Sequence, residues 1–357
     1  MKILITSPSL DTTINVSGIS TIVNSLISHN SECEYVHYLL GKPDRISSKF
    51  NWFVSFVKQL LYFPFFVKKN RVDLVHQNLP LNTKGIYREF IINCWCRLIG
   101  KPILLHVHGG AFLSKKPKTI LCRRIIKSLF RRSDIVIVLS DVEKEYIAKL
   151  YNYKSAISLC NSVDTEQFIS ENKFIVGKVP TLLFMGRIHE SKGVEDIVEA
   201  FRLLKGSINL KFVLCGDGPL KGYLVQACEE LLGDNFIFRG VLSGQEKIDV
   251  IKEADVFLLP SRYGEGMPMA LLETMAAGVV PVVTDDASMK YLIKHQTTGI
   301  IVEKNNPQDL SLKITHLLTH PDLYESISHE ATKLIISDYN IDTYINSLNK
   351  LYRSILK

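Results

Sequence analysis

The feature that most limits the fold of this chain is a regular alternation. Apolar runs of strand length are each followed by a helical stretch, and the whole pattern occurs twice. Strands that alternate with helices pair in parallel, and the helices cover both faces of the sheet. The sequence therefore predicts an α/β protein with two Rossmann-like, doubly wound parallel-sheet domains. The apolar runs are residues 3–6, 35–39, 72–76, 103–107, 135–139 and 156–159, and then 181–185, 210–215, 236–238, 256–259, 280–284 and 299–302.

The pattern breaks near residues 161–180, where a polar stretch precedes Pro180. A chain of 357 residues is long for one ordinary domain and suits two. We predict an N-terminal domain over 1–163 and a C-terminal domain over 164–340, with a last helix at about 340–357 that packs back on the first. Ligands of such sheets bind outside the carboxyl ends of the strands. Two facing domains are therefore expected to form an interdomain cleft.

The charge is distributed unevenly along the chain. Residues 1–163 hold 23 lysines and arginines against 10 aspartates and glutamates, a net charge of +13, whereas residues 164–357 carry −6. A basic half suggests an anionic partner, such as acidic lipid headgroups, a lipid diphosphate or a nucleic acid. We see no nucleic-acid recognition motif, and aromatic residues are not interleaved with the basic cluster at 115–132. Nucleic acid is therefore not an expected partner.

The cysteines and the N-terminus bear on the compartment and on metals. The seven cysteines are an odd number and contain no paired CxxC spacing, which indicates reduced thiols and no zinc site. The first residues, 1–6, have the pattern of a β-strand and lack the features of a signal peptide. A cytoplasmic protein is expected, with neither a metal nor a cofactor.

The most informative motif is the block from Gly264 to Gly278, which reads Gly-Glu-Gly-Met-Pro-Met at its start and follows a strand. A helix that begins near Pro268 would present free backbone N–H groups and a positive dipole end to a diphosphate. Glu265 and Glu273 are eight positions apart, about 12 Å of rise on an ideal helix. That is too far for the carboxylate pair of a retaining glycosidase, about 5–5.5 Å. We interpret them as holding two parts of one extended ligand; the alternative is an ordinary turn with solvent-facing glutamates.

A second motif follows another strand of the same half and contains Arg187 and Lys192, between Gly186 and Gly193. Both cations are expected at the carboxyl edge of the second sheet. An arginine can donate two hydrogen bonds to phosphate oxygens, and a lysine acts as a point charge. They suit a nucleotide diphosphate, whose developing negative charge must be stabilised when it leaves.

Two weaker signals lie in the first half. His108 comes directly after a buried strand and before Gly109 and Gly110, where a ligand can approach the backbone. His106 lies on the same side of that strand, and we interpret it as structural. Gly18, in the loop before the first helix, suits a phosphate or sugar near a helix N-terminus. A third glycine-rich segment, 215–222, resembles a dinucleotide fingerprint, but its spacing is wrong by one and we interpret it as a tight turn.

Together these motifs resemble the retaining glycosyltransferases of family 4, which have the GT-B fold. The resemblance covers nearly the whole chain. Its most specific part is the Glu265-x7-Glu273 block with Gly278, followed by 186–193, by Gly216-Asp-Gly-Pro and by the hinge 161–164. Met267 and Pro268 depart from the Phe-Gly that is common in the family, and a proline removes one possible N–H donor to the phosphates.

The resemblance implies that domain 1–163 binds the acceptor and domain 164–340 binds the nucleotide sugar. It also implies a role for each matched residue. Arg187 and Lys192 would bind the donor diphosphate, Glu265 the donor sugar and Glu273 the nucleotide ribose. His108 would lie near the transferred sugar. Gly18 would let a loop approach the phosphates or acceptor, and Gly266, Met267 and Met269 would line the donor site. The implied reaction keeps the anomeric configuration of the sugar and needs no metal. The predicted enzyme is thus a hexosyltransferase that uses a nucleoside-diphosphate sugar and an acceptor hydroxyl.

The segment 50–67 is unusually aromatic and is flanked by Arg45, Lys49 and further cations at 68–71. It is shorter than the about 20 apolar residues of a spanning helix, and Lys58 and Pro64 interrupt it. It is either a buried crossover helix or a helix at the membrane interface. A basic cluster after His108 favours an anionic membrane surface. That cluster comprises Lys115, Lys116, Lys118, Arg123, Arg124, Lys127, Arg131 and Arg132.

These features lead us to expect a peripheral enzyme on the inner face of the plasma membrane. Its acceptor would be a saccharide or a lipid-linked saccharide, as in the biosynthesis of bacterial surface polysaccharides. Two other functions fit the same architecture. One is a sugar-nucleotide epimerase, and the other is a non-catalytic subunit that binds a sugar nucleotide.

Overall fold

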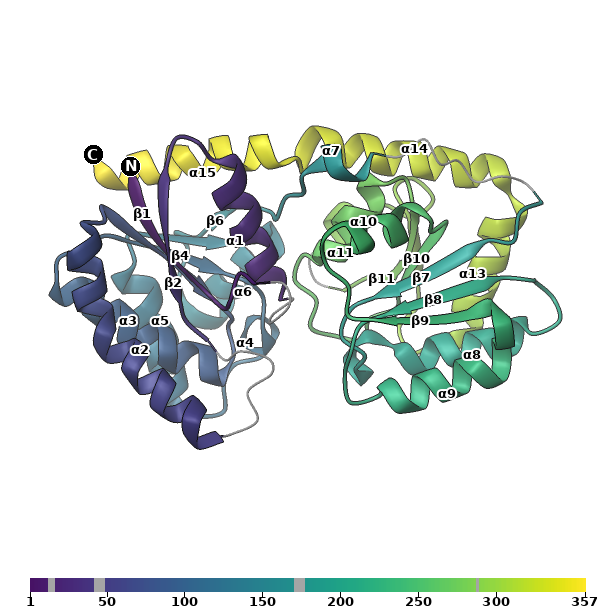
Figure 1. The fold of residues 1–357 in the computed structure, drawn as a ribbon, viewed down its shortest axis with the longest axis horizontal. Helices are drawn as coiled ribbons and strands as arrows, with labels where there is room; N and C mark the ends of the chain where they lie inside the picture. Colours follow the sequence, from purple (N-terminus) through teal and green to yellow (C-terminus); the bar gives the residue numbers. More distant parts are fainter. Residues whose placement is uncertain (12–16, 42–48, 170–176, 287–288) are drawn as a thin grey trace. The chain divides into compact units, whose positions relative to one another are not determined.

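The computed structural model describes residues 1–11, 17–41, 49–169, 177–286 and 289–357, except for the side chains of 49–53 and 114 (Figure 1). The chain divides into two compact units. The first unit is Met1–Ser162 together with Ile341–Lys357, and the second unit is Val163–Asn340. Each unit contains one six-stranded sheet, and every strand pairing in both sheets is parallel. The predicted α/β fold with two parallel sheets is confirmed.

The sheet of the first unit has the strand order β2-β1-β3-β4-β5-β6. Helices α2, α3 and α5 lie side by side on one face, and α1 and α15 pack together on the other (Figure 1). The strands are β1 (Lys2–Ser7), β2 (Glu34–Leu39), β3 (Leu74–Leu79), β4 (Ile103–Val107), β5 (Ile135–Val138) and β6 (Ile157–Ser158). The helices are α1 (Gly18–His29), α2 (Lys49–Asn70), α3 (Thr83–Leu98), α4 (Ala111–Ser114), α5 (Ile120–Arg132), α6 (Asp141–Tyr151) and α15 (Ile341–Leu356).

The sheet of the second unit has the order β12-β11-β10-β7-β8-β9. Helices α8, α9 and α13 form one layer, and α10, α11 and α14 form another. The strands are β7 (Thr181–Met185), β8 (Lys211–Cys215), β9 (Phe236–Gly240), β10 (Val256–Leu259), β11 (Val280–Thr284) and β12 (Ile300–Val302). The α-helices are α7 (Thr165–Phe168), α8 (Val194–Leu204), α9 (Lys221–Leu232), α10 (Gly244–Lys252), α11 (Met269–Ala276), α12 (Met289–Leu292), α13 (Pro307–Thr319) and α14 (Pro321–Asp338), and two 3₁₀ helices are η1 (Glu190–Lys192) and η2 (Gly233–Asn235).

The C-terminal helix α15 is anchored in the first unit by a buried polar contact. The side-chain amides of Asn349 and Asn30 exchange two hydrogen bonds of 2.9 and 3.1 Å. The hydroxyl of Tyr352 lies 2.7 Å from Nδ1 of His76 on β3. Buried polar groups without partners are costly, so these bonds fix the position of the helix against the sheet.

Helix α2 connects β2 to β3, and its two sides differ. Phe63 and Val67 are fully buried in the core of the first unit, whereas Leu61 and Phe65 are 67% and 59% exposed. Thus α2 is a crossover helix that also presents apolar side chains on its outer side. Arg45, which precedes the helix in the sequence, lies outside the described residues. No helix in the described ranges is long and apolar enough to cross a membrane.

Candidate active site

The topology of the second sheet brings together the motif that contains Arg187 and Lys192 and the motif that contains Glu265. The chain passes from β7 to β8 and β9 on one side and then returns to β10 on the other side of β7. In doubly wound sheets, ligands bind outside the carboxyl ends of the strands at such a switch point. Lys192 lies in η1 after β7, and Glu265 lies in the loop after β10. Residues that are 73 positions apart thereby meet at one point of the sheet edge.

The Glu265 carboxylate is the centre of this edge. Its Oε1 atom lies 2.5 Å from Nζ of Lys192, and the same oxygen accepts a hydrogen bond from the hydroxyl of Ser261. The backbone N–H of Glu265 donates to Oδ2 of Asp286 at 2.9 Å. Asp286 forms an ion pair with Lys304. Glu265 therefore ties the three loops together: its carboxylate, whose side chain is only 4% exposed, joins the loops after β7 and β10, and its backbone N–H joins the loop after β11.

Close backbone packing at this edge requires glycine. A Cβ atom on Gly193 would lie 2.0 Å from the carbonyl oxygen of Pro260, and one on Gly216 would lie 1.9 Å from that of Gly186. Gly218 approaches the carbonyl of Ile188 in the same way, at 2.2 Å. The fingerprint-like glycines at 216–218 therefore pack against the loop that carries Arg187. Larger residues would push that loop away from the sheet.

The two arginines near this edge have different surroundings. Arg262 forms ion pairs with Glu195 and Asp196 at 2.5 and 2.8 Å, which fasten the loop after β10 to the start of α8. Arg187 is exposed, and it forms no ion pair with any residue that the structure describes. A guanidinium that is not committed to a protein carboxylate can bind an anionic ligand.

Helix α11 begins at Met269, one residue later than the start near Pro268 suggested by the sequence. Pro268 is the N-cap residue, since its ψ of 125° is extended, and the cap has no side-chain hydrogen bond. The first turn of a helix has N–H groups without intrahelical partners and attracts negative charge. Met267 is buried beside this helix start, and Gly266 and Met269 are half-buried.

Glu273, in the middle of α11, is held by a lysine from another helix. Its Oε1 atom lies 2.6 Å from Nζ of Lys247 on α10, and the Glu273 side chain is only 3% exposed. Its second oxygen, Oε2, is buried and has no hydrogen-bond partner in the described residues. Glu265 and Glu273 are thus paired with different lysines, and one oxygen of Glu273 is left without a hydrogen-bond partner among the described residues.

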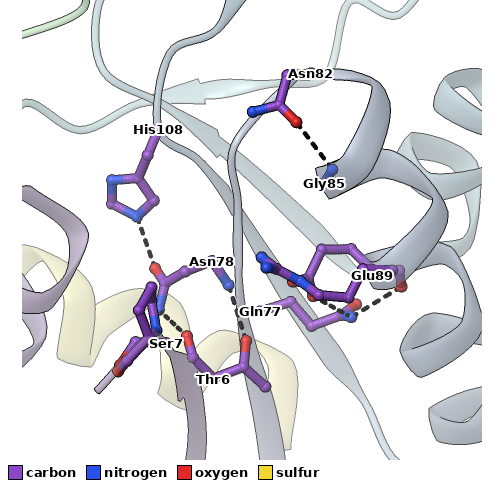
Figure 2. A network of polar contacts seen from close by, with 10 residues as sticks. Thr6, Ser7, Gln77, Asn78, Asn82, Gly85, Glu89 and His108 are labelled. Atoms are coloured by element: carbon purple, nitrogen blue, oxygen red, sulfur yellow. Dashed lines mark hydrogen bonds and ion pairs between the residues drawn. The ribbon is translucent and has the colours of Figure 1, made fainter. Parts of the chain in front are cut away.

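The first unit has a switch point of its own, between β1 and β3. There the side chain of Asn78 joins Thr6 on β1 to His108 in the loop after β4 (Figure 2). The Asn78 Nδ2 atom donates to the Thr6 carbonyl at 2.7 Å, and Oδ1 lies 2.6 Å from Nε2 of His108. Loss of hydration lowers the pKa of His108 to about 3, so its ring is neutral at physiological pH.

His108 packs on a second histidine. The ring centroids of His106 and His108 are 4.0 Å apart, and His76 stacks on His106 with a centroid distance of 5.5 Å. His106 is fully buried, and neither of its ring nitrogens has a hydrogen-bond partner in the described residues. Gly18 is exposed and is the first residue of α1, after the N-cap Ser17.

Several polar residues at the switch points of the two sheets were not predicted from the sequence. Ser261 and Asp286 follow strands that were predicted, so their position after a strand was an available signal. Asn78 lies two positions after the run predicted at 72–76, so the same signal was available for it. Lys247 gave no such signal, because it acts through a contact between two helices. Across the described residues, no group of three His, Cys, Asp or Glu side chains could hold a metal ion.

Comparison with known proteins identifies the class. The family model of the glycosyl transferases group 1 matches residues 165–351, and the Glycosyltransferase Family 4 model matches residues 25–167. Among solved structures, Anabaena Alr3699/HepE in complex with UDP-glucose has a TM-score of 0.78 at 14% identity, over 99% of this chain and 100% of that one. Sucrose-phosphate synthase from Thermosynechococcus elongatus has a TM-score of 0.79 at 16% identity, over 99% and 98%. The fold is therefore the GT-B fold.

Curated relatives agree with this class. The UDP-Gal:alpha-D-GlcNAc-diphosphoundecaprenol alpha-1,3-galactosyltransferase of Escherichia coli is 27% identical over 324 residues, 83% of this chain and 79% of the relative. The N,N'-diacetylbacillosaminyl-diphospho-undecaprenol alpha-1,3-N-acetylgalactosaminyltransferase of Campylobacter jejuni is 27% identical over 323 residues, 82% and 83%. The chain belongs to the group 1 glycosyl transferases, of the family 4 type, and is a glycosyltransferase.

The Lys247–Glu273 pair gives a prediction about the second unit. Substitution Lys247→Met leaves a buried carboxylate without its counter-charge, and we expect the free energy of unfolding to fall by about 3–5 kcal/mol. Urea-dependent hydrogen exchange of β10 and β11 measures the unfolding of the second unit. Tryptophan fluorescence would not report on it, because both tryptophans of the chain, Trp52 and Trp95, belong to the first unit.

The matched control is Lys221→Met, which removes an exposed ion pair with Asp217 at 3.7 Å. Exposed pairs contribute about 0–1 kcal/mol. Equal losses in the two variants would show that the Lys247 pair does not hold Glu273 in place.

Proposed function

We propose that this glycosyltransferase moves a hexosyl group from a nucleoside-diphosphate sugar to an acceptor hydroxyl with retention of the anomeric configuration. One observation carries the proposal. A buried carboxylate, Glu265, and two cations, Lys192 and Arg187, occur together at the switch point of the second sheet. The cations match a diphosphate, and the carboxylate matches sugar hydroxyls.

The chemistry follows from the leaving group. The bond between the anomeric carbon and the β-phosphate oxygen breaks, and the diphosphate departs with increased negative charge. Arg187, Lys192 and the start of α11 stabilise that charge, and fixed positive groups do this without reorganisation. The acceptor oxygen forms its bond on the same face of the sugar, and its proton passes to the departing phosphate. These cations perform the task that a metal ion performs in other transferases, so the proposed reaction is metal-independent.

The remaining contacts are proposed residue by residue. Glu265 accepts hydrogen bonds from the donor sugar, beside Gly266, Met267 and Met269. Glu273 accepts a hydrogen bond from the nucleotide ribose through Oε2, which is buried and has no protein partner.

Two residues of the first unit complete the proposed set. His108 contacts the transferred sugar. Gly18, at the exposed start of α1, lets a phosphate or an acceptor approach the backbone.

The acceptor that we propose is a lipid-linked saccharide in the synthesis of a bacterial surface polysaccharide. Two relatives act, according to their names, on saccharides linked to diphospho-undecaprenol. A third is the putative colanic acid biosynthesis glycosyltransferase WcaL of Salmonella typhimurium, 28% identical over 239 residues.

An acceptor of that kind lies in a membrane, and the first unit carries a suitable surface. Residues 90–133 contain ten lysines and arginines and no aspartate or glutamate. Ile120 and Leu121 are 63% and 57% exposed at the start of α5. The neighbouring helices of this face, α2 and α3, also expose apolar side chains, namely Leu61, Tyr62, Phe65, Tyr87, Ile91 and Leu98. We propose that this face binds the anionic inner surface of the plasma membrane.

The donor site is tested first by nucleotide binding. UDP is the leading probe, because the Escherichia coli relative is named for UDP-Gal, and other nucleoside diphosphates complete the panel. In the presence of EDTA we expect one nucleotide family to bind to the wild-type protein. The Arg187→Ala variant should bind it about 10- to 100-fold more weakly, since a hydrogen bond to a charged group contributes about 1.5–3 kcal/mol. Isothermal titration calorimetry gives both dissociation constants.

Arg202→Ala is the control for this experiment, because Arg202 is an exposed arginine that pairs with Glu199 at the end of α8. It should bind the nucleotide as the wild type does. Absence of binding by the wild type, or equal binding by all three proteins, would contradict the assigned donor site.

The membrane surface is tested by sedimentation with liposomes. Wild-type protein should bind vesicles that contain anionic lipid at low salt and lose binding at high salt, because the attraction is electrostatic. The double variant Arg124→Glu/Arg131→Glu should lose most of this binding, as each basic residue near the surface contributes about 1 kcal/mol. The double variant Lys205→Glu/Lys333→Glu reverses two exposed lysines of the second unit and is the control. Equal binding by both double variants would reject this surface.

A further inference from the structure

Asn78 has an arrangement that the sequence did not indicate. It lies on β3, is only 3% exposed, and belongs to the strand next to β1 at the switch point of the first sheet. Its backbone N–H donates to Oγ1 of Thr6 at 3.2 Å, and its side-chain Nδ2 donates to the Thr6 carbonyl at 2.7 Å. Both the backbone and the side chain of Asn78 are therefore fixed by β1 (Figure 2).

These bonds determine which way the amide group points. The Thr6 carbonyl can only accept a hydrogen bond, so the NH₂ group of Asn78 must face it. The carbonyl oxygen Oδ1 then faces His108, whose Nε2 atom lies at 2.6 Å. Because Oδ1 is also only an acceptor, Nε2 of His108 must carry a proton.

The surroundings of His108 keep its ring uncharged. His106 packs on it at a centroid distance of 4.0 Å, and His76 stacks on His106. Loss of hydration in these surroundings disfavours the charged form of the His108 ring. No carboxylate forms an ion pair with His108 in the described residues. Burial and the neighbouring imidazoles lower the pKa of His106 well below its ordinary value, so this neighbour is also neutral.

We infer that Asn78 is a positioning residue, which fixes His108 as the neutral tautomer with a proton on Nε2 and a lone pair on Nδ1. The ring then presents a hydrogen-bond acceptor, and it binds a hydroxyl group. It supplies no positive charge to a phosphate. Any ligand group at this nitrogen is a hydrogen-bond donor, and within the proposed function that group is a sugar hydroxyl. This inference rests on the proposed function for the identity of the ligand, whereas the tautomer follows from the contacts of Asn78 alone.

The tautomer is measured by long-range ¹H–¹⁵N NMR on protein labelled with ¹⁵N-histidine, with the His108→Gln variant to assign the signals. In the wild type we expect the Nε2-protonated form, without protonation of the ring between pH 8 and about pH 5. A signal from the Nδ1-protonated form, or ring titration near the ordinary pKa of about 6.5, would overturn the inference.

Two variants of Asn78 extend the test. Asn78→Leu removes the acceptor at similar size, and the His108 signals should then show a mixture of tautomers. Asn78→Asp places a carboxylate beside Nε2, which should raise the pKa of His108 and produce a cationic ring near neutral pH. An unchanged tautomer in Asn78→Leu would contradict the inference. If neither variant folds, the wild-type spectrum alone decides it.

Asn93 provides the control, because it is a fully buried asparagine of the same unit whose side-chain amide donates to Gln77 and Ser133, whereas His108 bonds to Asn78. Asn93→Leu should lower stability and leave the His108 signals unchanged. In an activity assay with a nucleotide-sugar donor and an acceptor saccharide, Asn78→Leu should reduce kcat about 10- to 100-fold, because the His108 ring is misplaced. The spectrum requires no substrate, so failure of the proposed function and failure of this inference are observed separately.

Discussion

Parallel strand pairing is the constraint on which the rest of this structure depends. A parallel sheet places the carboxyl ends of all its strands at one edge, and reversal of the winding direction creates a switch point there. In the second unit this point lies between β7 and β10, and in the first unit between β1 and β3. Lys192 and Glu265 meet at the former, and Thr6 and Asn78 at the latter. Both groups of polar side chains thus result from topology, not from proximity in the sequence.

The two switch points differ in how their buried polar side chains are paired. Buried polar groups must be paired, and buried charges must be neutralised or hydrogen-bonded. In the second unit, oppositely charged side chains pair, so the edge retains a carboxylate and cations that a nucleotide sugar can engage. In the first unit, neutral amides and imidazoles form hydrogen bonds, and the histidine stays uncharged. Charge is therefore concentrated at the edge of the second unit, where the nucleotide sugar is proposed to bind, whereas Thr6, Asn78 and His108 at the switch point of the first unit are neutral.

The sequence predicted the fold better than it predicted the site. Apolar runs that alternate with helices are a strong signal, because a parallel strand is buried on both faces. The prediction for β3 covered residues 72–76, whereas the strand extends from Leu74 to Leu79, since polar Gln77 and Asn78 are buried there with hydrogen-bond partners. Asn78 was missed for that reason. Lys247 was missed because its contact with Glu273 joins two helices whose spacing carries no periodic signal.

We propose retention and metal independence for this glycosyltransferase, and the configuration of the product formed without metal tests both most directly. The purified protein is incubated in EDTA with an α-configured nucleotide sugar of the base selected by calorimetry and with a diphosphate-linked acceptor saccharide. The one-bond and vicinal NMR couplings at the anomeric carbon of the product are then measured. We expect an α-linked product. A β-linked product, a requirement for added metal, or epimerisation of the donor without an acceptor would contradict it.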